Sequence, residues 1–349
     1  MGDALRLDLP EGWSASRPVE ADAVELTRLR RGHERQARGW AGASQKMVQM
    51  EVSDRGYLTR ENVVLRDQHG SVRAWASAHD RAAGRMLLAV TVDHDVPSSL
   101  ADRAAAALFA WADDVGRRFG RERGLAVQQV DTGAFADDER QQRWLSQQGF
   151  EHVRTWWQMS RPVDADDAAR DIGTHEAVRI RPVGRTGAGL PDQDDLRCVH
   201  DILESAFADH FNSHEESFDE FVSRLREDPG HRWDHWWIAD FLEDDEPTPV
   251  GALVGSVTES VDGGAQGTYV EYIGVLAQAR GRGVAKSLLN TVIADAASRS
   301  RDHVGLEVDA SSPTGAEGLY LSMGWVTSYV TQSWHREVDC AGNEPHVGG

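Results

Sequence analysis

The sequence predicts an α/β protein with two domains, and three observations carry this prediction. The chain has 349 residues, more than a single hydrophobic core usually holds. Between Val270 and Ala296 it passes from an apolar strand through a glycine-containing turn into an amphipathic helix. Patterns of the first half also return in the second half, roughly 165 to 185 residues later. We therefore expect two similar units, each with a sheet flanked by helices.

The strand, turn and helix of the second half together predict an anion-binding site. The strand contains Val270, Tyr272 and Ile273, which are β-branched or aromatic residues. The turn contains Gly281 and Gly283, and from position 284 apolar residues recur at helical spacing, at 284, 285, 288, 289, 292, 293 and 296. This order directs free backbone N–H groups and the positive end of a helix dipole to one place, which suits a phosphate.

The spacing of residues in the turn excludes two common nucleotide-binding motifs. A Walker loop needs glycine before Lys286-Ser287 and another five residues earlier, but Ala285 and Arg280 occupy these positions. A dinucleotide fingerprint starting at Gly281 needs glycine or alanine where Lys286 stands. The sequence instead reads R-x-x-G-x-A, with Arg280, Gly283 and Ala285.

This pattern resembles the acetyl-CoA pyrophosphate loop of the GNAT superfamily of N-acetyltransferases. The resemblance implies cofactor-binding roles for one group of residues: Val275, Arg280, Gly281, Arg282, Gly283, Val284 and Ala285. Small residues let the backbone amides approach a pyrophosphate, and the two arginines add positive charge. An ordinary glycine-rich turn between a strand and a helix is the alternative interpretation.

A second GNAT signature follows in the chain. After the apolar strand V-G-L-E-V, Ser312 stands where the family most often has asparagine, and Tyr320 is followed by the pair Gly324-Trp325. The resemblance implies that Ser312 contacts the cofactor, although a hydroxyl offers fewer hydrogen bonds than an amide. It also implies that Tyr320 is the general acid, with a packed helix-face aromatic as the alternative.

The repeat extends the resemblance to both halves. Arg17-Pro18-Val19 returns as Arg181-Pro182-Val183, and Gly149-Phe150 corresponds to Gly324-Trp325. Each half thus resembles a complete GNAT domain, with a mixed, mainly antiparallel sheet flanked by helices. The expected organisation of the chain is an N-terminal domain over 1–163, a linker over 164–176, a C-terminal domain over 177–340 and a flexible tail over 341–349.

Only the second half is expected to bind the cofactor. In the first half, the loop after Val92 reads D-H-D-V-P-S-S, with two carboxylates and a proline that donates no N–H. Leu145 stands in the place of Tyr320. A degenerate first domain before a working second one resembles the tandem-GNAT proteins, the mycothiol synthases among them.

The chemistry of amine acetylation suggests which residues carry the reaction. The amine must attack as a neutral base, although ammonium groups titrate near ~10, so a carboxylate must take a proton directly or through water. On its predicted strand, Glu271 alternates with Tyr269 and Ile273 on one face. It is the only carboxylate on that strand and is the candidate base, with a solvent-facing edge charge or a salt bridge as the alternative. A bulge near Gly274-Val275 would supply the oxyanion donor by resemblance to the family.

Composition limits the class of partner and the compartment. The net charge of −20 disfavours nucleic acid and permits a cationic amine. No apolar run suits a membrane span, no secretory leader is visible, and two cysteines fit a reducing cytoplasm. The pairs His210/His214 and His231/His235 lack a third ligand at a recognisable spacing, so no metal is expected.

Together these features predict an acetyl-CoA-dependent N-acetyltransferase. The C-terminal domain is expected to transfer an acetyl group to the primary amine of a small molecule by direct attack. Mycothiol synthase activity is one alternative, and an acyl-CoA-binding regulator without turnover is another. The identity of the amine, the acyl-chain preference and the oligomeric state are not predicted.

Overall fold

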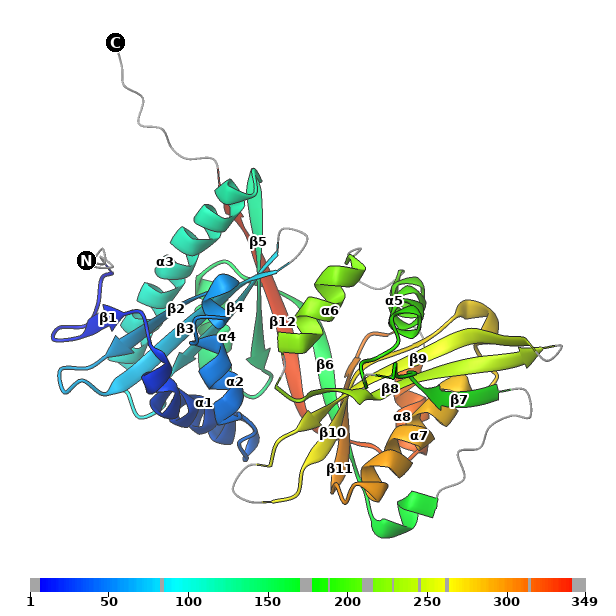
Figure 1. Cartoon of the computed structure of the whole chain (residues 1–349). Helices are drawn as coiled ribbons and strands as arrows, with labels where there is room; N and C mark the ends of the chain where they lie inside the picture. Colours follow the sequence, from blue (N-terminus) through cyan, green and yellow to red (C-terminus); the bar gives the residue numbers. More distant parts are fainter. Residues whose placement is uncertain are drawn as a thin grey trace. The chain divides into compact units, whose positions relative to one another are not determined.

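The computed structural model describes residues 7–81, 85–169, 178–187, 189–208, 216–227, 229–243, 246–260, 264–312 and 315–340 (Figure 1). The chain forms two compact units. Unit 1 contains residues 1–156 and 329–349, and unit 2 contains residues 157–328. Most of the expected linker and the whole expected tail lie outside the described residues, apart from a short 3-10 helix at Ala165–Ala169.

The sheet of unit 1 has the strand order β1-β2-β3-β4-β5-β12. Its strands are β1 (Ser14–Ser16), β2 (Arg60–Arg66), β3 (Val72–Arg81), β4 (Arg85–Val92), β5 (Val127–Phe135) and the greater part of β12 (Val326–Asp339). Only β4 and β5 pair in parallel, while the other described pairs are antiparallel. The sheet is therefore mixed and mainly antiparallel, as the sequence predicts.

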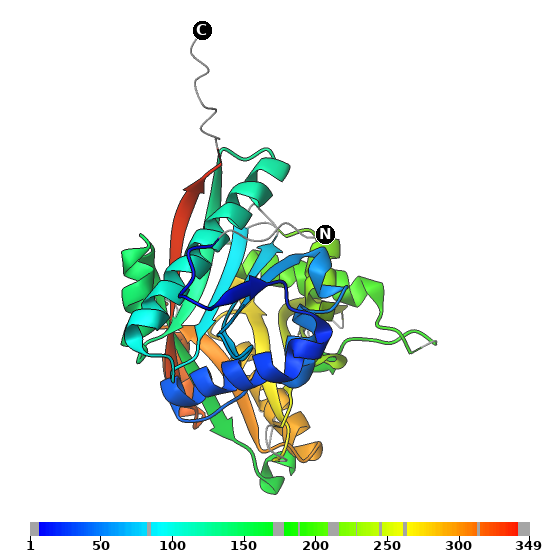
Figure 2. The same ribbon diagram turned by 90° about the vertical axis from the view of Figure 1, so that its left-hand side faces the viewer.

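Helices cover both faces of this sheet (Figure 2). They are α1 (Ala23–Arg38), α2 (Gln45–Glu51), α3 (Ser98–Glu122) and α4 (Glu139–Gln147). Unit 1 has a hydrophobic core on each face of its sheet, and the side chains of β2 alternate between them. Val63 and Leu65 pack with α3, whereas Val64 packs with α1 and α2. The long helix α3 provides the crossover that a parallel pair of strands requires.

Unit 2 repeats this architecture, with the strand order β7-β8-β9-β10-β11-β6. Its strands are β7 (Val178–Pro182), β8 (His231–Glu243), β9 (Glu246–Thr258), β10 (Gly267–Val275), β11 (His303–Asp309) and residues 157–162 of β6 (Glu151–Pro162). Its helices are α5 (Gln193–Phe207), α6 (Phe218–Glu227), α7 (Val284–Ser298) and α8 (Ala316–Ser322). Again one pair, β10 and β11, is parallel and is joined through a helix.

Two separate cores fill the faces of the unit 2 sheet. We call the core that contains α7 and α8 the α7-side core, and the core that contains α5 and α6 the α5-side core. Consecutive residues of β8 alternate between them, so that Trp236 and Ile238 lie in the α5-side core and Trp237 in the α7-side core. The tryptophans of β8 are thus structural.

The compact units do not coincide with the two halves of the sequence. Each half contributes five strands to its own unit, but the sixth position is filled by the last strand of the other half. Residues 157–162 of β6 belong to unit 2, and residues 331–339 of β12 pair with β5 in unit 1. The expected domain boundaries at 163 and 340 therefore differ from the compact units at these two strands.

In both units the parallel strands pair over only part of their length. In unit 2, β10 and β11 pair from Thr268 with Val304 to Val270 with Leu306, although β10 continues to Val275 and β11 to Asp309. The remainder of β10 pairs with β9 alone in the described part of the chain. In the described part of the chain, residues 272–275 of β10 have no partner strand on the β11 side, and we call this place the β10–β11 fork.

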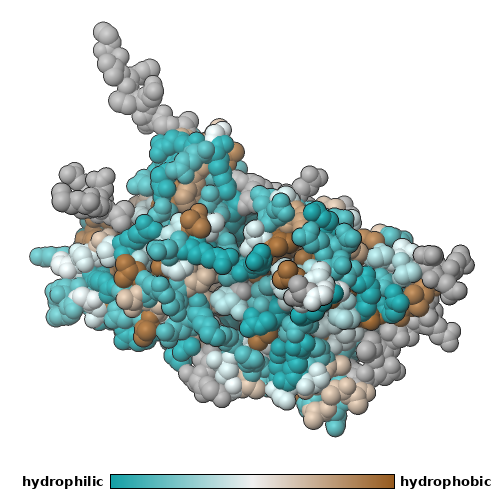
Figure 3. All heavy atoms as spheres, in the orientation of Figure 1, coloured by the Kyte–Doolittle hydropathy of each residue, from teal (hydrophilic) through white to brown (hydrophobic). Residues whose placement is uncertain are grey.

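The surface agrees with the charged composition of the chain. Hydrophilic residues cover most of the face seen in Figure 3, in keeping with 27% charged residues. No helix in the described ranges has the length and the apolar character that crossing a bilayer requires.

Candidate functional site

The turn between β10 and α7 has the geometry of an anion-binding loop. A short 3-10 helix (Ala277–Ala279) and an extended Arg280 lead to Gly281 and Gly283, whose φ angles are 74° and 78°. Both values lie in the left-handed region that glycine adopts without strain. A side-chain carbon placed at either glycine would have no neighbour within 4 Å, so the space beside the backbone is open.

The start of α7 is free of competing groups. The N-cap residue is Gly283, which has no side chain to cap the helix, and the first turn contains no acidic residue. Residues 280–283 are exposed, whereas Val284 is buried in the α7-side core and fixes the helix behind them. The first backbone N–H groups of α7 are thus directed at open space, with the positive helix end behind them.

The predicted loop residues lie together at one edge of the sheet. Val275 ends β10, and residues 280–285 follow within a single turn. Arg280 is exposed at the turn, whereas the guanidinium of Arg282 lies over the ring of Phe241, 4.9 Å from its centroid. This stacking limits the freedom of Arg282 and holds its charge near the loop.

Ser312 and Tyr320 follow the carboxyl end of β11. The backbone N–H of Ser312 donates to the carbonyl of Asp309 in the turn after the strand, while residues 313 and 314 lie outside the described part. Because β10 and β11 are parallel, this turn and the loop at 280–285 lie at the same edge of the sheet. Ser312 thus follows β11 at the sheet edge from which β10 leads into the loop at 280–285.

Tyr320 lies on α8 and is almost completely buried. Its ring packs against Trp325, with the centroids 5.9 Å apart, and burial raises the pKa of its phenol to about 12. The hydroxyl therefore stays protonated at neutral pH and is able to donate a hydrogen bond. Desolvation is the only cause of this shift, and the side chain lies in the α7-side core.

Glu271 lies at an irregularity of β10. The pairing with β9 shifts between Val270 and Tyr272, so Glu271 is the extra residue of a β-bulge. One oxygen of Glu271 accepts a hydrogen bond of 2.6 Å from the hydroxyl of Ser256. The bulge follows the last residue of β10 that pairs with β11, which places Glu271 at the root of the β10–β11 fork.

The bulge corrects two details expected from the sequence. It reverses the alternation of side chains, so that Val270 and Ile273 pack with the α7-side core and Tyr272 with the α5-side core. Glu271 thus does not share a face with Ile273. The bulge also lies at Glu271 and not at Gly274-Val275, which pair regularly with β9. Gly274 instead permits close packing with α5, since a side-chain carbon there would be 2.9 Å from the Cβ of Ala206.

A second carboxylate, Glu307, lies on the other strand of the fork and is not among the residues predicted from the sequence. Glu307 follows Leu306, the last residue of β11 that pairs with β10. Its carboxylate accepts a hydrogen bond of 2.9 Å from Gln158, whose own side-chain oxygen accepts one of 3.4 Å from Tyr269. Glu307 is exposed on one side, while the protein groups packed around its carboxylate raise its pKa by desolvation. A lone carboxylate inside the apolar run V-G-L-E-V was the signal in the sequence.

The helix α5 lines a shallow concavity in unit 2, of about 380 Å³. Its lining residues are Asp194, Arg197, Cys198, Asp201, Ile202, Ser205, Pro249 and Leu276. Burial raises the pKa of the Cys198 thiol to about 11, so it is not a thiolate nucleophile at neutral pH. The other cysteine, Cys340, is buried in unit 1.

The histidines noted in the sequence do not form a site in unit 2. His210 and His214 lie outside the described residues. His231 packs edge-on against Trp233, with ring centroids 4.4 Å apart, and desolvation lowers its pKa to about 4. His235 is buried and lies 2.8 Å from a carboxylate oxygen of Asp234. Neither is a member of a potential metal cluster in the ranges that the structure describes.

The corresponding loop of unit 1 is closed on itself. The carboxylate of Asp93 pairs with Arg73 at 2.9 Å and also accepts the backbone N–H of Asp95. Arg140 donates to the carbonyl of Val92 at 2.8 Å, and Pro97, which has no N–H, is the N-cap of α3. In unit 1, carboxylates and backbone groups that already take part in hydrogen bonds thus stand where unit 2 has its open loop.

Comparisons with known proteins agree with this geometry. Residues 199–325 match the model of the acetyltransferase (GNAT) family. A GCN5-related N-acetyltransferase from Sphaerobacter thermophilus is similar in structure, with a TM-score of 0.71, 24% identity and coverage of 95% of this chain and 97% of that chain. A tandem GNAT protein from the clavulanic acid biosynthesis pathway gives a TM-score of 0.67 and 11% identity, with 93% and 98% covered.

A more distant structure is also similar. N-myristoyltransferase of Saccharomyces cerevisiae with bound myristoyl-CoA has a TM-score of 0.57 and 10% identity, over 94% of this chain and 80% of that chain. At these identities the structural likeness speaks for the fold. A search of curated protein sequences found no significant match.

Proposed function

Residues 199–325 match the acetyltransferase (GNAT) family model, and the chain is similar in fold to a tandem GNAT protein. We therefore propose that unit 2 transfers an acetyl group from acetyl-CoA to the primary amine of a small molecule. The observation that carries this proposal is the open loop at Gly281 and Gly283, with uncapped N–H groups at the start of α7. These donors fit a pyrophosphate in both charge and geometry.

The residues of the chain fit the cofactor at three points. The N–H groups after Gly283 and the charges of Arg280 and Arg282 suit the pyrophosphate, and Ser312 lies in the neighbouring turn. Residues 272–275 of β10 have no partner strand on the β11 side among the described residues, so their backbone groups suit an extended chain such as pantetheine. When bound, acetyl-CoA supplies a thioester carbonyl that an amine can attack.

Two carboxylates at the fork are placed to take the proton of the amine. Glu271 and Glu307 each follow the last paired residue of their strand. A general base works best when its pKa is near the pH of the reaction, and the raised pKa of Glu307 moves it in this direction. We propose that these two groups remove the proton, directly or through water, and that Tyr320 donates one to the departing thiolate.

Direct attack is preferred to transfer through an enzyme thiol. Cys198 is the only cysteine in unit 2, and its raised pKa keeps it in the thiol form at neutral pH. Holding the amine and the thioester together then supplies much of the rate.

The charge and the cysteine content of the chain bear on the amine and on the compartment. The net charge of −20 would favour a cationic amine through long-range attraction. Two unpaired cysteines are consistent with a cytoplasmic location.

An assay of free thiol release against a panel of amines tests the proposed activity. Including the cysteinyl amine of a pseudodisaccharide in the panel separates mycothiol synthase activity from acetylation of other small amines. If acetyl-CoA binds but no amine in the panel releases thiol, the alternative of a non-catalytic acyl-CoA-binding regulator is favoured.

One chain is expected to bind one equivalent of acetyl-CoA. In unit 1 the loop after β4 offers Asp93, Asp95 and Pro97, and like charges near a pyrophosphate raise its free energy. Isothermal titration calorimetry of the full chain measures the stoichiometry. Two equivalents in the wild type would contradict the proposed division between the units.

Glu307→Gln and Glu271→Gln form a matched pair that identifies the base. Each replaces a carboxylate at the fork by an amide of the same shape, and the base variant is expected to lose ~10²–10⁴-fold in turnover. Protonation inactivates a base, so the wild-type rate should rise with pH through the raised pKa of Glu307. Loss of this acidic limb only in Glu307→Gln would identify Glu307, whereas an unchanged profile in that variant would exclude it.

A further inference from the structure

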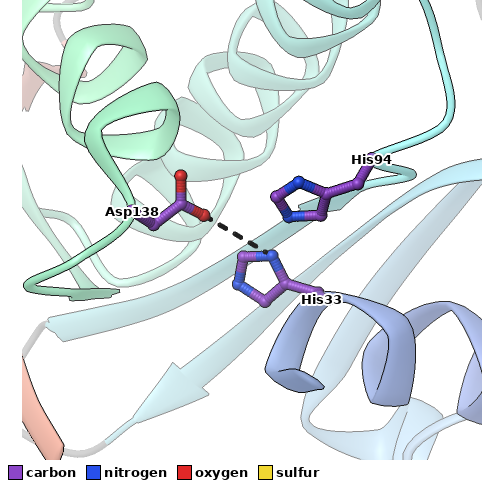
Figure 4. Close-up of side chains that lie close together, drawn as sticks. All are labelled: His33, His94 and Asp138. Atoms are coloured by element: carbon purple, nitrogen blue, oxygen red, sulfur yellow. Dashed lines mark ion pairs between the residues drawn. The ribbon is translucent and has the colours of Figure 1, made fainter. Parts of the chain in front are cut away.

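Two histidines and an aspartate from distant parts of the sequence meet in unit 1 (Figure 4). His33 comes from α1, His94 from the loop between β4 and α3, and Asp138 from the N-cap of α4. One nitrogen of each ring and one carboxylate oxygen all lie within 4.8 Å of one another. The two imidazoles stack, with ring centroids 5.6 Å apart, and His33 also packs on Phe135.

The polar atoms of this cluster lack hydrogen bonds. Nδ1 of His33, Nε2 of His94 and Oδ2 of Asp138 are all buried and have no hydrogen-bond partner in the described structure. The side chain of Asp138 is only 4% exposed, and that of His33 is 11% exposed. A buried polar atom without a partner costs about 1–3 kcal/mol, and more when it carries a charge. Three such atoms facing one another therefore call for a shared partner.

A hydrogen bond within the cluster does not supply this partner. Nδ1 of His33 and Oδ2 of Asp138 are 3.6 Å apart, which is longer than a hydrogen bond. The other oxygen of Asp138 is already used, because it accepts the backbone N–H of Gln141 at 2.9 Å as the cap of α4. This cap fixes the carboxylate and leaves Oδ2 directed at the histidines, as Figure 4 shows.

From this arrangement we propose that His33, His94 and Asp138 bind a divalent transition-metal ion of the zinc class. Two imidazole nitrogens and one carboxylate oxygen are ligands that Zn²⁺ accepts, and three protein ligands leave a fourth position for water. Ligand atoms at ~2.0–2.2 Å from a tetrahedral metal lie about 3.3–3.6 Å apart, so the cluster needs side-chain shifts of about 1 Å.

The protonation states suit a metal. Desolvation lowers the pKa of His33 to about 4 and also lowers the pKa of His94, so both rings are neutral at pH 7 and can coordinate. The charges that act on the pair are the cation Arg140 and several carboxylates: Asp138, Glu34, Asp93 and Asp95. Arg140 opposes a bound cation, but its guanidinium donates to the carbonyl of Val92 and is outnumbered by the carboxylates.

The location indicates what the ion would do. His94 belongs to the loop after β4 in unit 1, which is equivalent to the loop of the predicted cofactor site in unit 2. The unit 1 loop lacks glycines and is closed by its own hydrogen bonds. A metal joining α1, this loop and the start of α4 would hold together three segments far apart in sequence. Binding to the folded state alone would stabilise unit 1 through linkage.

Titration of the metal-free full chain with Zn²⁺ tests the proposal. The expected result is one equivalent that survives a chelator of moderate affinity, together with a rise in Tm. His33→Phe and His94→Phe keep an aromatic ring for the stacking but remove the ligand atom, and each should weaken binding by ~10²-fold or more. His69→Ala, which removes an exposed histidine of the same unit, is the control and should bind as the wild type does.

Cobalt substitution provides a readout that does not depend on the variants. Co²⁺ at the cluster should give the visible absorption of a four-coordinate site, and excess Zn²⁺ should abolish it. The proposal is overturned if the wild type holds no stoichiometric ion, or if folded His33→Phe and His94→Phe bind as tightly as His69→Ala. If the two variants do not fold, the cobalt spectrum of the wild type decides.

Discussion

Tyr320→Phe is expected to lower turnover by ~10²–10⁴-fold while leaving the affinity for acetyl-CoA unchanged. The substitution removes one hydroxyl and keeps the ring that packs against Trp325. Burial raises the pKa of this phenol to about 12, so the wild-type hydroxyl carries its proton at the pH of the reaction. A protonated phenol is able to donate this proton to the departing thiolate.

Tyr272→Phe is the matched control for this prediction. Tyr272 also lies in unit 2 and is half-buried, but its hydroxyl accepts a hydrogen bond of 2.9 Å from Arg224. Removing it should cost about 0.5–1.5 kcal/mol of stability, up to ~3 kcal/mol because the donor is charged, with little effect on the chemical step. Steady-state kinetics with an accepted amine, and calorimetry with acetyl-CoA, separate the two variants. Unchanged turnover in Tyr320→Phe would make Tyr320 a packing residue only.

The parts of the fold that the sequence predicts are those set by local pattern. The strand before Val275, the turn with Gly281 and Gly283 and the helix from Val284 all follow from side-chain period and backbone freedom within about twenty residues. The mixed, mainly antiparallel sheets are confirmed as well. The prediction of two similar sheets depends on the internal repeat, whose equivalent segments lie in equivalent places in the two units.

The exchange of the last strands could not be predicted in this way. β6 and β12 both follow a glycine-aromatic pair and carry similar alternating residues, so either strand suits the edge of β5 or of β11. Pairing partners that are far apart in sequence are chosen by tertiary packing, which a local pattern does not contain. A fragment starting near Thr174 would lack residues 157–162 of the unit 2 sheet, so experiments on cofactor binding are better done with the full chain.

The site residues that were missed depend on contacts between distant segments. Glu307 becomes a candidate base only when the pairing of β10 with β11 is seen to end beside it. His33, His94 and Asp138 have no spacing typical of a metal motif, because each comes from a different segment. The sequence offered histidine pairs four residues apart as candidate ligands, whereas the cluster in unit 1 consists of single residues from separate segments. Spacing reveals ligands on one helix, but not ligands that the fold brings together.

Gly283→Val is expected to raise the Kd for acetyl-CoA by ~10²-fold or more. Gly283 has a φ of 78° and is the N-cap of α7, and a β-branched residue in the left-handed region costs about 1–2 kcal/mol. The new side chain would meet no protein atom within 4 Å of its Cβ, so it would project into the space that the pyrophosphate is proposed to fill. Losing even one charge-assisted hydrogen bond adds about 1.5–3 kcal/mol.

Gly39→Val separates the strain from the loss of the site. Gly39 ends α1 in unit 1 with a φ of 85°, and a Cβ there would also have no neighbour within 4 Å. Both variants should therefore lose similar amounts of free energy of unfolding, but only Gly283→Val should lose affinity for acetyl-CoA in calorimetry. Equal affinities in the two variants would show that the loop after β10 does not hold the pyrophosphate. If Gly283→Val folds but binds acetyl-CoA more weakly than Gly39→Val does, the phosphate-binding amides lie at the start of α7.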